Sequence, residues 1–259
     1  MAGVCFAGQR PKARKRCHPL AACGARGLRD ILAQMPPSTA TALVIAEGAI
    51  RVSALLDAPP TARACYVLAH GAGAGMTHPF MAAVAAGLLA RGIATLRYQF
   101  PYMEAGKKRP DPPALAHATV RAAVAAAARE LPNLPLVAGG KSFGGRMTSQ
   151  AQAATRLPNV RGLAFLGFPL HPAGRPSRER AQHLATVDIP MLFLQGTRDE
   201  LAQLAELEPV VEALGKRVTL RLFEDADHSF HVPRRSGHTD AQVLDEVLNA
   251  LAGWIDAVG

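Results

Sequence analysis

The sequence predicts an α/β fold in which a mainly parallel β-sheet is covered by helices on both faces. From Thr41 onward, short apolar runs of strand length alternate with longer segments of helical length. The runs at 64–69 and 134–138 are apolar almost throughout, which is typical of strands buried on both faces. At 259 residues, the chain is long enough for one such domain with a sizeable core.

Turn residues and helix ends divide the chain into its expected elements. Glu47 and Gly48 turn the first two strands into an antiparallel hairpin. Gly92 ends the first helix, and Pro132 ends the Ala-rich helix after it. Strands are expected at residues 42–46, 49–56, 64–69, 93–98, 134–140, 162–167, 190–195 and 218–223. Helices are expected at residues 79–91, 114–131, 143–154, 200–214 and 240–258. Irregular loops are expected at residues 100–113 and 168–188.

The connection between the strand near Leu166 and the strand near Met191 is short. It has only about two dozen residues, which is too few for a large helical lid domain. A site at this edge of the sheet is therefore expected to be open. An open pocket favours small soluble substrates over long-chain lipids.

The net charge of +9 is concentrated at the N-terminus. Residues 1–34 hold seven Lys or Arg residues and one acid, Asp30, which leaves only +3 for the rest of the chain. Aromatic residues make up 5% of the chain, so the basic and aromatic surface of a nucleic-acid-binding domain is not expected. No apolar run approaches the about 20 residues of a membrane span.

Residues 1–38 are expected to form a basic N-terminal extension, and residues 39–259 the folded domain. The extension is rich in arginine but lacks the apolar region and cleavage site of a secretory signal. It is superficially similar to a transit peptide. We interpret it as a disordered segment or as a start assigned too far upstream, with Met35 the natural first residue. A role in targeting RNA or a membrane surface is the alternative.

The cysteine pattern indicates a reducing compartment. Cys5, Cys17 and Cys23 lie in the extension without the spacing of a zinc module. Cys65 lies alone in an apolar run, where it is expected to pack as a small buried hydrophobe. Because there is no disulfide framework, we expect a cytoplasmic protein. We also expect neither a metal nor another cofactor.

The stretch Gly140–Gly144, GKSFG, carries the strongest functional signal. In a strand-to-helix turn of the pattern Gly-x-Ser-x-Gly, the serine hydroxyl is exposed on a strained turn beside the helix N-terminus. Glycine is needed at both flanks because a Cβ would collide with the neighbouring strand and helix. The stretch is not a phosphate-binding P-loop, because Pro135 occupies the position of that motif's first glycine. Ser142 is therefore the predicted nucleophile; a serine in an ordinary Gly-rich turn is the alternative.

Residues after two later strands complete a serine-hydrolase arrangement. Asp199 follows the strand at 190–195, and His228 follows the strand at 218–223. The carboxyl ends of parallel strands meet at one edge of a sheet, where sites form. A serine hydroxyl needs a base, which we assign to His228, and Asp199 would hold the imidazole and stabilise its protonated form. The order nucleophile, acid, base is the chain order of α/β-hydrolases.

Other residues compete for these roles. Asp199 is also placed to cap the helix expected at 200–214. Asp225 and Asp227 are rival acids, but they lie too close to the histidine in sequence to come from a separate strand end. His231 is the rival base.

The loop His70–Gly75 is expected to supply part of an oxyanion hole. We assign the backbone amides of Phe143 and Ala72 as its donors, with Gly73 as the other candidate for the second position. His70 is expected to be a structural residue of the loop, because its imidazole is not needed if His228 serves as the base.

Five side chains are candidates for the mouth of the pocket, where they would favour an anionic substrate: Arg97, Tyr102, Lys141, Arg146 and His171. For Arg146, the alternatives are to face solvent or to clamp the loop at 100–102. That loop, Phe-Pro-Tyr, is as readily a packing corner as a substrate contact.

Six motifs follow one another along the chain: HGAGAG at 70–75, FPYME at 100–104, GGKSFGGR at 139–146, GFPLHP at 167–172, QGTRD at 195–199 and DADHSF at 225–230. From about residue 41 to the C-terminus, the chain resembles a group of predicted α/β-hydrolases. Eukaryotic relatives of that group include testis-expressed proteins and a subunit of a chromatin-modifying complex. The resemblance implies a compact α/β-hydrolase fold, similar to dienelactone-hydrolase-like enzymes, with the triad at Ser142, Asp199 and His228. Phe143 departs from the group, where methionine is more frequent, but it contributes only its amide.

These observations together predict a serine hydrolase that cleaves a small carboxylester or thioester through an acyl-enzyme. The alternative is a catalytically silent scaffold or interaction protein with the same fold, because the eukaryotic members act partly as complex subunits. The presence of all three triad residue types favours the enzyme.

Overall fold

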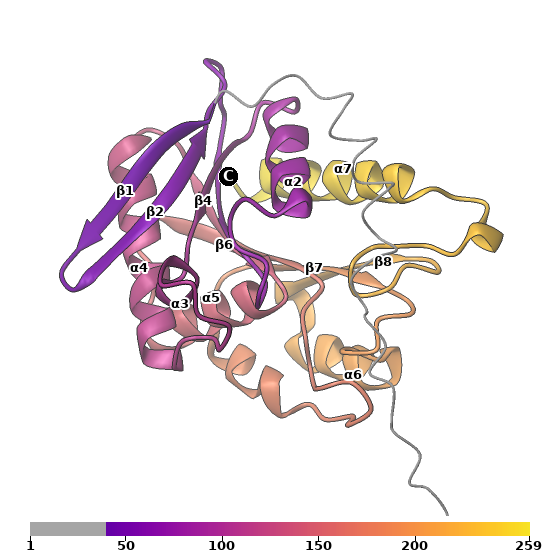
Figure 1. Ribbon diagram of the computed structural model, residues 1–259. Helices are drawn as coiled ribbons and strands as arrows, with labels where there is room; N and C mark the ends of the chain where they lie inside the picture. The colour runs from indigo at the N-terminus through magenta and orange to yellow at the C-terminus, as the bar shows by residue number, and fades with distance from the viewer. Residues whose placement is uncertain (1–39) are drawn as a thin grey trace, which may run out of the picture.

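The computed structural model describes residues 40–259, which are built around one eight-stranded sheet (Figure 1). The strands are β1 (Thr41–Glu47), β2 (Ile50–Asp57), β3 (Cys65–Ala69), β4 (Ala94–Tyr98), β5 (Leu136–Lys141), β6 (Val160–Leu166), β7 (Met191–Gly196) and β8 (Val218–Phe223). Their order across the sheet is β1-β2-β4-β3-β5-β6-β7-β8. The β1–β2 and β2–β4 pairs are antiparallel and the others are parallel, which confirms the predicted mainly parallel sheet. The expected extension at 1–38 lies outside the described residues.

Helices cover both faces of the sheet, as predicted (Figure 1). One face carries α2 (Pro79–Leu89) and α7 (Asp240–Val258), and the other carries α4 (Pro113–Glu130), α5 (Phe143–Ala154) and α6 (Leu204–Leu214). Alternate residues of β3 divide between the two cores: Val67 packs on the α4 and α5 side, and Tyr66 and Leu68 pack on the α2 and α7 side. Two buried faces explain why this strand is apolar along its whole length.

Cys65 lies fully buried in the core, which confirms the sequence-based expectation. Burial raises the pKa of its thiol to about 12, because the thiolate would lose its hydration. The residue therefore packs as a small hydrophobe.

Two loops that were expected to be irregular contain short helices. The four-residue helix α3 (Pro101–Glu104) begins with proline, whose fixed φ suits the first helical position. A 3₁₀-helix, η1 (Glu179–Thr186), lies between β6 and β7. The other short helices are η2 (Gly215–Arg217) and η3 (Arg234–Ser236). Because η1 is the only helix between β6 and β7, no large lid covers this edge of the sheet, in agreement with the prediction.

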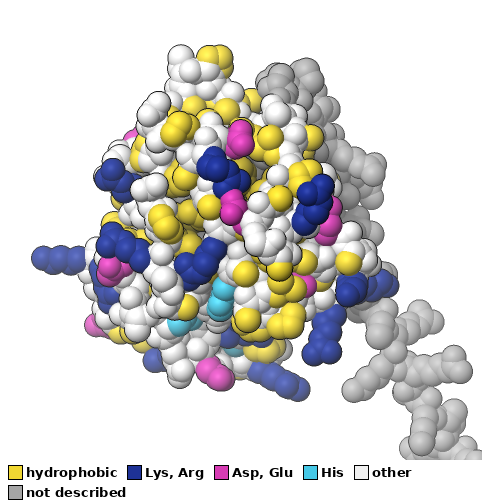
Figure 2. All heavy atoms as spheres, turned by 90° about the vertical axis from the view of Figure 1, so that its left-hand side faces the viewer, with side chains coloured by type: hydrophobic (Ala, Val, Ile, Leu, Met, Phe, Trp, Pro, Cys, Tyr) yellow, Lys and Arg dark blue, Asp and Glu magenta, His cyan; other side chains and the backbone are white. Residues whose placement is uncertain are grey.

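The surface over the β1–β2 hairpin, α3 and α4 is mixed in character (Figure 2). Basic side chains are spread across this face among apolar and acidic ones. Among residues 40–259, no helix is both long enough and apolar enough to cross a bilayer.

Candidate active site

Ser142 lies in the tight turn between β5 and α5, and glycine is required on both sides of it. A Cβ on Gly140 would lie 2.2 Å from the carbonyl oxygen of Ala69. A Cβ on Gly144 would lie 2.6 Å from the carbonyl oxygens of both Ala69 and His70. The predicted need for glycine is confirmed, and the obstacle is the end of β3 and the loop after it, which press against the turn.

The backbone of Ser142 is strained, with φ of 50° and ψ of −115°. L-residues rarely adopt a positive φ, and such strain concentrates at functional sites. The turn is held from both sides. The Ser142 amide donates to the carbonyl of Leu166 at 3.2 Å, and the Ser142 carbonyl accepts from the amide of Arg146 at 3.1 Å. The serine is thus fixed between β6 and the first turn of α5.

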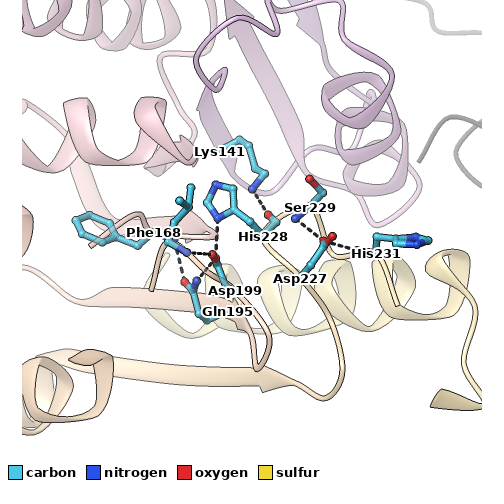
Figure 3. A network of polar contacts seen from close by, with 9 residues as sticks. Lys141, Phe168, Gln195, Asp199, Asp227, His228, Ser229 and His231 are labelled. Carbon is cyan, nitrogen blue, oxygen red and sulfur yellow. Dashed lines mark hydrogen bonds and ion pairs between the residues drawn. The ribbon is translucent and has the colours of Figure 1, made fainter. Parts of the chain in front are cut away.

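Asp199 follows β7 and is the centre of a buried polar network (Figure 3). Its Oδ2 atom lies 2.6 Å from Nδ1 of His228 and also accepts a hydrogen bond from the side-chain amide of Gln195. Its Oδ1 atom accepts from the amide of Leu201 at 2.8 Å. Gln195 is oriented in turn, because its Oε1 atom accepts from the amide of Phe168 at 2.9 Å. The side chain of Asp199 is fully buried, and these hydrogen bonds hold the carboxylate in one orientation toward the imidazole.

The two ring nitrogens of His228 differ. Nδ1 faces the carboxylate of Asp199, so in the neutral ring the proton lies there and Nε2 is left as an acceptor. Nε2 is buried, and no group among the described residues forms a hydrogen bond with it. In hydrolases without bound substrate, the contact between base and nucleophile is often longer than a hydrogen bond.

The pKa of His228 lies below its ordinary value. Burial contributes most, because it disfavours the charged ring, and the positive charge of Lys141 acts in the same direction. The hydrogen bond and negative charge of Asp199, and the charge of Asp227, oppose both effects. The ring is therefore neutral at pH 7, which is the form in which an imidazole accepts a proton.

The loop after β8 that carries His228, residues 224–231, is called the histidine loop below, and the rival residues in it have other contacts (Figure 3). Oδ1 of Asp227 accepts from the amides of Ser229 and His231, at 2.7 and 3.0 Å, and so shapes the loop. His231 Nδ1 pairs with Oδ2 of Asp240 at 2.7 Å, at the start of α7. Asp225 adopts a positive φ of 58° in the turn after β8. These contacts separate the rivals from the Asp199–His228 pair.

The capping alternative for Asp199 is wrong. Helix α6 begins at Leu204, four residues later than expected, and its N-cap residue is Gln203. Asp199 instead closes the turn before the helix, through the amides of Leu201 and Ala202.

The geometry separates the two candidates for the second oxyanion donor. The amide of Gly73 donates to Oη of Tyr102 at 3.0 Å, so it is already engaged. Among residues 40–259, no group accepts from the amides of Ala72 and Phe143. Ala72, Ser142 and Phe143 line one cavity. This arrangement favours Ala72 over Gly73.

The cavity at Ser142 has a volume of about 360 Å³, which is at the small end for ligand sites. Two arginines line it, Arg146 from α5 and Arg180 from η1, together with Asp111. Arg180 was not predicted from the sequence, because it lies in a Pro- and Arg-rich segment without periodicity. Within the described part of the chain, no three metal-ligating side chains come together.

Of the five candidates for the pocket mouth, only Arg146 lines this cavity. Arg97 is 3% exposed and forms a buried ion pair with Asp57 at 2.8 Å. Tyr102 is 2% exposed, and its hydroxyl holds Gly73. The expectation that these two side chains contact substrate is wrong, because both are occupied inside the protein.

The other two candidates also point elsewhere. His171 is fully buried, and its Nδ1 lies 2.9 Å from the carbonyl oxygen of Pro172. The ammonium of Lys141 donates to the backbone carbonyl of His228 (Figure 3). Neither residue lines the cavity. Lys141 was expected at the pocket mouth because it precedes Ser142 in the sequence. That expectation is wrong, because its side chain points from β5 toward the histidine loop.

The loop at 100–102 is a packing corner. The ring of Phe100 is fully buried and meets the ring of Phe143 edge-on, with centroids 5.3 Å apart. Its amide donates to Nε2 of His70 at 3.1 Å, and Nδ1 of His70 lies 2.8 Å from the carbonyl of Gly71. Burial lowers the pKa of His70 to about 4. His70 is thus a neutral link between two loops, as expected.

The sheet order and the strained serine turn between β5 and α5 are those of an α/β-hydrolase fold. A model of the family described as an alpha/beta hydrolase domain matches residues 62–256, and the chain belongs to this family.

Solved structures of hydrolases share this fold. Dienelactone hydrolase from Anabaena variabilis is 22% identical with a TM-score of 0.71, over 85% of this chain and 97% of that one. A serine hydrolase without a lid from Xanthomonas campestris is 21% identical with a TM-score of 0.65, over 86% and 96%. Est1E from Butyrivibrio proteoclasticus, solved with ferulic acid bound, is 18% identical with a TM-score of 0.64, over 83% and 98%. At these identities the likeness establishes the fold alone.

Proposed function

We propose that the protein is a serine hydrolase that cleaves a small carboxylester or thioester. Ser142 is the nucleophile, His228 the base, and Asp199 the residue that orients the base. One observation carries this proposal: the imidazole of His228 is held by Asp199 through Nδ1, and its buried Nε2 has no partner among the described residues. The strained turn of Ser142 at the same edge of the sheet supports it.

The reaction follows from these positions. Ser142 Oγ attacks the carbonyl carbon while its proton passes to Nε2 of His228, and Asp199 stabilises the imidazolium. The amides of Ala72 and Phe143 stabilise the oxyanion, aided by the N-terminus of α5. The imidazolium then protonates the leaving alcohol or thiol, and the acyl-enzyme forms. A water molecule, deprotonated by His228, hydrolyses the acyl-enzyme and restores the serine.

The charged side chains that line the cavity, Arg146, Arg180 and Asp111, are net positive together, which favours an anionic substrate. Arg146 and Arg180 both line it, and among residues 40–259 neither guanidinium forms an ion pair. Burial, and then the nearby positive charge of Arg180, lower the pKa of Arg146. Two like charges beside one cavity are relieved by an anion between them. We infer that the substrate carries a carboxylate or similar group.

Labelling with a fluorophosphonate probe tests the reaction class. The wild-type chain is expected to react, and Ser142→Ala is expected not to react. A folded wild-type chain that stays unlabelled would contradict the proposal and favour the scaffold alternative.

Two expectations from the sequence stay predictions. They are the location in a reducing, cytoplasmic compartment and the resemblance to testis-expressed and chromatin-complex proteins.

Paired esters that differ in one carboxylate test the substrate class. Arg146→Glu is expected to raise KM for the anionic ester by about tenfold or more, and KM for the neutral ester much less. Arg161→Glu is the matched control, because Arg161 is exposed on β6 and does not line the cavity. Equal changes for both esters would remove Arg146 from anion recognition.

A further inference from the structure

Lys141 occupies an unusual place: it precedes the proposed nucleophile, but its ammonium lies beside the proposed base. Its Nζ atom donates to the backbone carbonyl of His228 (Figure 3). The contact joins the end of β5 directly to the loop after β8. No other hydrogen bond between side chain and backbone links these two elements in residues 40–259.

Gly167 leaves the space in which this ammonium and the imidazole lie side by side. A Cβ on Gly167 would be 2.9 Å from Nζ of Lys141 and 3.3 Å from both Cε1 and Nδ1 of His228. The two groups are therefore no more than about 6 Å apart, close enough for their charges to interact. Gly167 also has a φ of +71°, which favours glycine.

Two aromatic rings lie close to the ammonium. Nζ lies 5.8 Å from the ring centroid of Phe80 and 5.6 Å from that of Phe230. The two rings stack with centroids 6.1 Å apart. Ring faces attract a cation and also exclude water from it. Among the described residues, the lysine has no ion-pair partner at contact distance.

The charged groups that face the imidazole come from three elements. Asp199, after β7, and Asp227, on the histidine's own loop, are negative. Lys141, from β5, is the only positive group among the described residues that acts on the ring. The pKa of His78, at the N-terminus of α2, is lowered by burial and then by the positive charge of Lys141. Lys141 therefore balances two carboxylates.

We propose that Lys141 is a positioning residue of this site: its ammonium holds the carbonyl of His228, and its positive charge opposes a second positive charge on the imidazole. The proposal rests on the proposed function in that His228 is the base. The hydrogen bond fixes the loop that aims the ring at Asp199. The charge keeps the ring in its neutral, proton-accepting form as the pH falls.

The charge effect has a limited pH range. Loss of hydration lowers the pKa of Lys141 to about 8, although Asp199 and Asp227 act to raise it. Below pH 8 the ammonium is charged and lowers the pKa of His228; above pH 8 it loses its proton and this effect fades. The same charge disfavours the imidazolium that forms during turnover. The charge of Lys141 therefore helps only in acidic solution, where it increases the fraction of His228 that is neutral.

The ring proton on Cε1 of His228, followed by NMR, tests the charge effect without turnover. In the Ser142→Ala chain, Lys141→Gln is expected to raise the titration midpoint by about one pH unit. Lys141→Arg keeps the charge and is expected to keep the midpoint. Lys216→Gln is the control, because Lys216 is exposed on η2. An unchanged midpoint in Lys141→Gln, or equal shifts in the Gln and Arg variants, would overturn the proposal.

The unaltered chain provides a second measurement that does not depend on any variant folding. Its His228 midpoint is expected below the ordinary value of 6.5, and a midpoint at or above 6.5 would contradict the proposal. In the active enzyme, the acid limb of kcat/KM should move with the NMR midpoint. If the NMR shift occurs but the wild type has no activity, the proposed function fails and this inference holds. If the wild type is active but neither the NMR midpoint nor the acid limb of kcat/KM moves in Lys141→Gln, the proposed function holds and this inference fails.

Discussion

Two serines belong to the α5 segment, Ser142 as its N-cap and Ser149 within the helix, and only Ser142 has the surroundings of a nucleophile. Ser149 is hydrogen-bonded to a histidine, with its Oγ 2.7 Å from Nε2 of His183. It lies within the helix, is fully buried, and also donates to the carbonyl of Arg146 at 3.0 Å. Ser142 begins the helix on a strained turn and lines the cavity.

The histidines differ even more than the serines. Asp199 contacts His228, whereas the charges that act on His183 are those of Arg146 and His117, which are both basic. Burial and these neighbours lower the pKa of His183 to about 4. Within residues 40–259, no carboxylate would therefore stabilise an imidazolium at His183. A hydrogen bond between serine and histidine is not enough for reactivity, which also needs access and a group that stabilises the charged base.

The largest expected difference is between the two serines. Ser142→Ala should lower kcat/KM for a small activated ester by about 10³-fold or more. Ser149→Ala should leave it within about threefold, because it removes only a buried structural hydrogen bond. Hydrolysis of p-nitrophenyl acetate measures both variants. Loss of activity in Ser149→Ala with an intact fold by circular dichroism would reverse the assignment.

The second contrast is between the two carboxylates that contact a histidine. Asp199→Asn should lower kcat/KM by about 10²- to 10⁴-fold, because an amide no longer favours the required tautomer or the imidazolium. Asp240→Asn breaks the equivalent contact with His231 and should change kcat/KM only a few-fold. The same ester assay applies to both. Similar losses in the two variants would mean that the assay reports loop stability and not the chemistry.

The smallest expected effect is on stability. Because the pKa of His183 is about 4 in the folded chain and near 6.5 when unfolded, the unfolded state binds more protons between these values. The contribution of the neutral His183 ring to the free energy of unfolding is therefore fully present above pH 6.5 and is lost as the pH falls toward 4. His183→Gln should reduce this loss of stability by about 1–2 kcal/mol. This is less than the whole pKa difference would give, because the ring is partly exposed. Urea unfolding at pH 7 and pH 4.5 measures it; an unchanged loss would place the proton uptake elsewhere, for example at His70.

The sequence predicted those parts of the site that depend on local pattern and chain order. Gly140 and Gly144 mark the serine turn because β3 leaves no room for a side chain there. Asp199 and His228 could be found because each follows a strand, and neighbouring parallel strands bring their carboxyl ends together.

The direction of individual side chains could not be predicted in the same way. Arg97 meets Asp57 because β2 and β4 are paired in a particular register, which a single sequence does not specify. Lys141 points to the histidine loop because Gly167, from another strand end, leaves a space there. Arg180 reaches the cavity from a short 3₁₀-helix without any periodic signal.

The contacts between the histidine loop and α7 form late, because α7 is the last element to be synthesised. Asp240 accepts from the amide of Val232 at 3.0 Å and contacts His231, so the loop is anchored to the N-terminus of the last helix. On the ribosome, the serine turn emerges about a hundred residues before that anchor. A nascent chain whose serine turn has already emerged therefore still lacks these contacts between Asp240 and the histidine loop, which form only after the start of α7 has been synthesised.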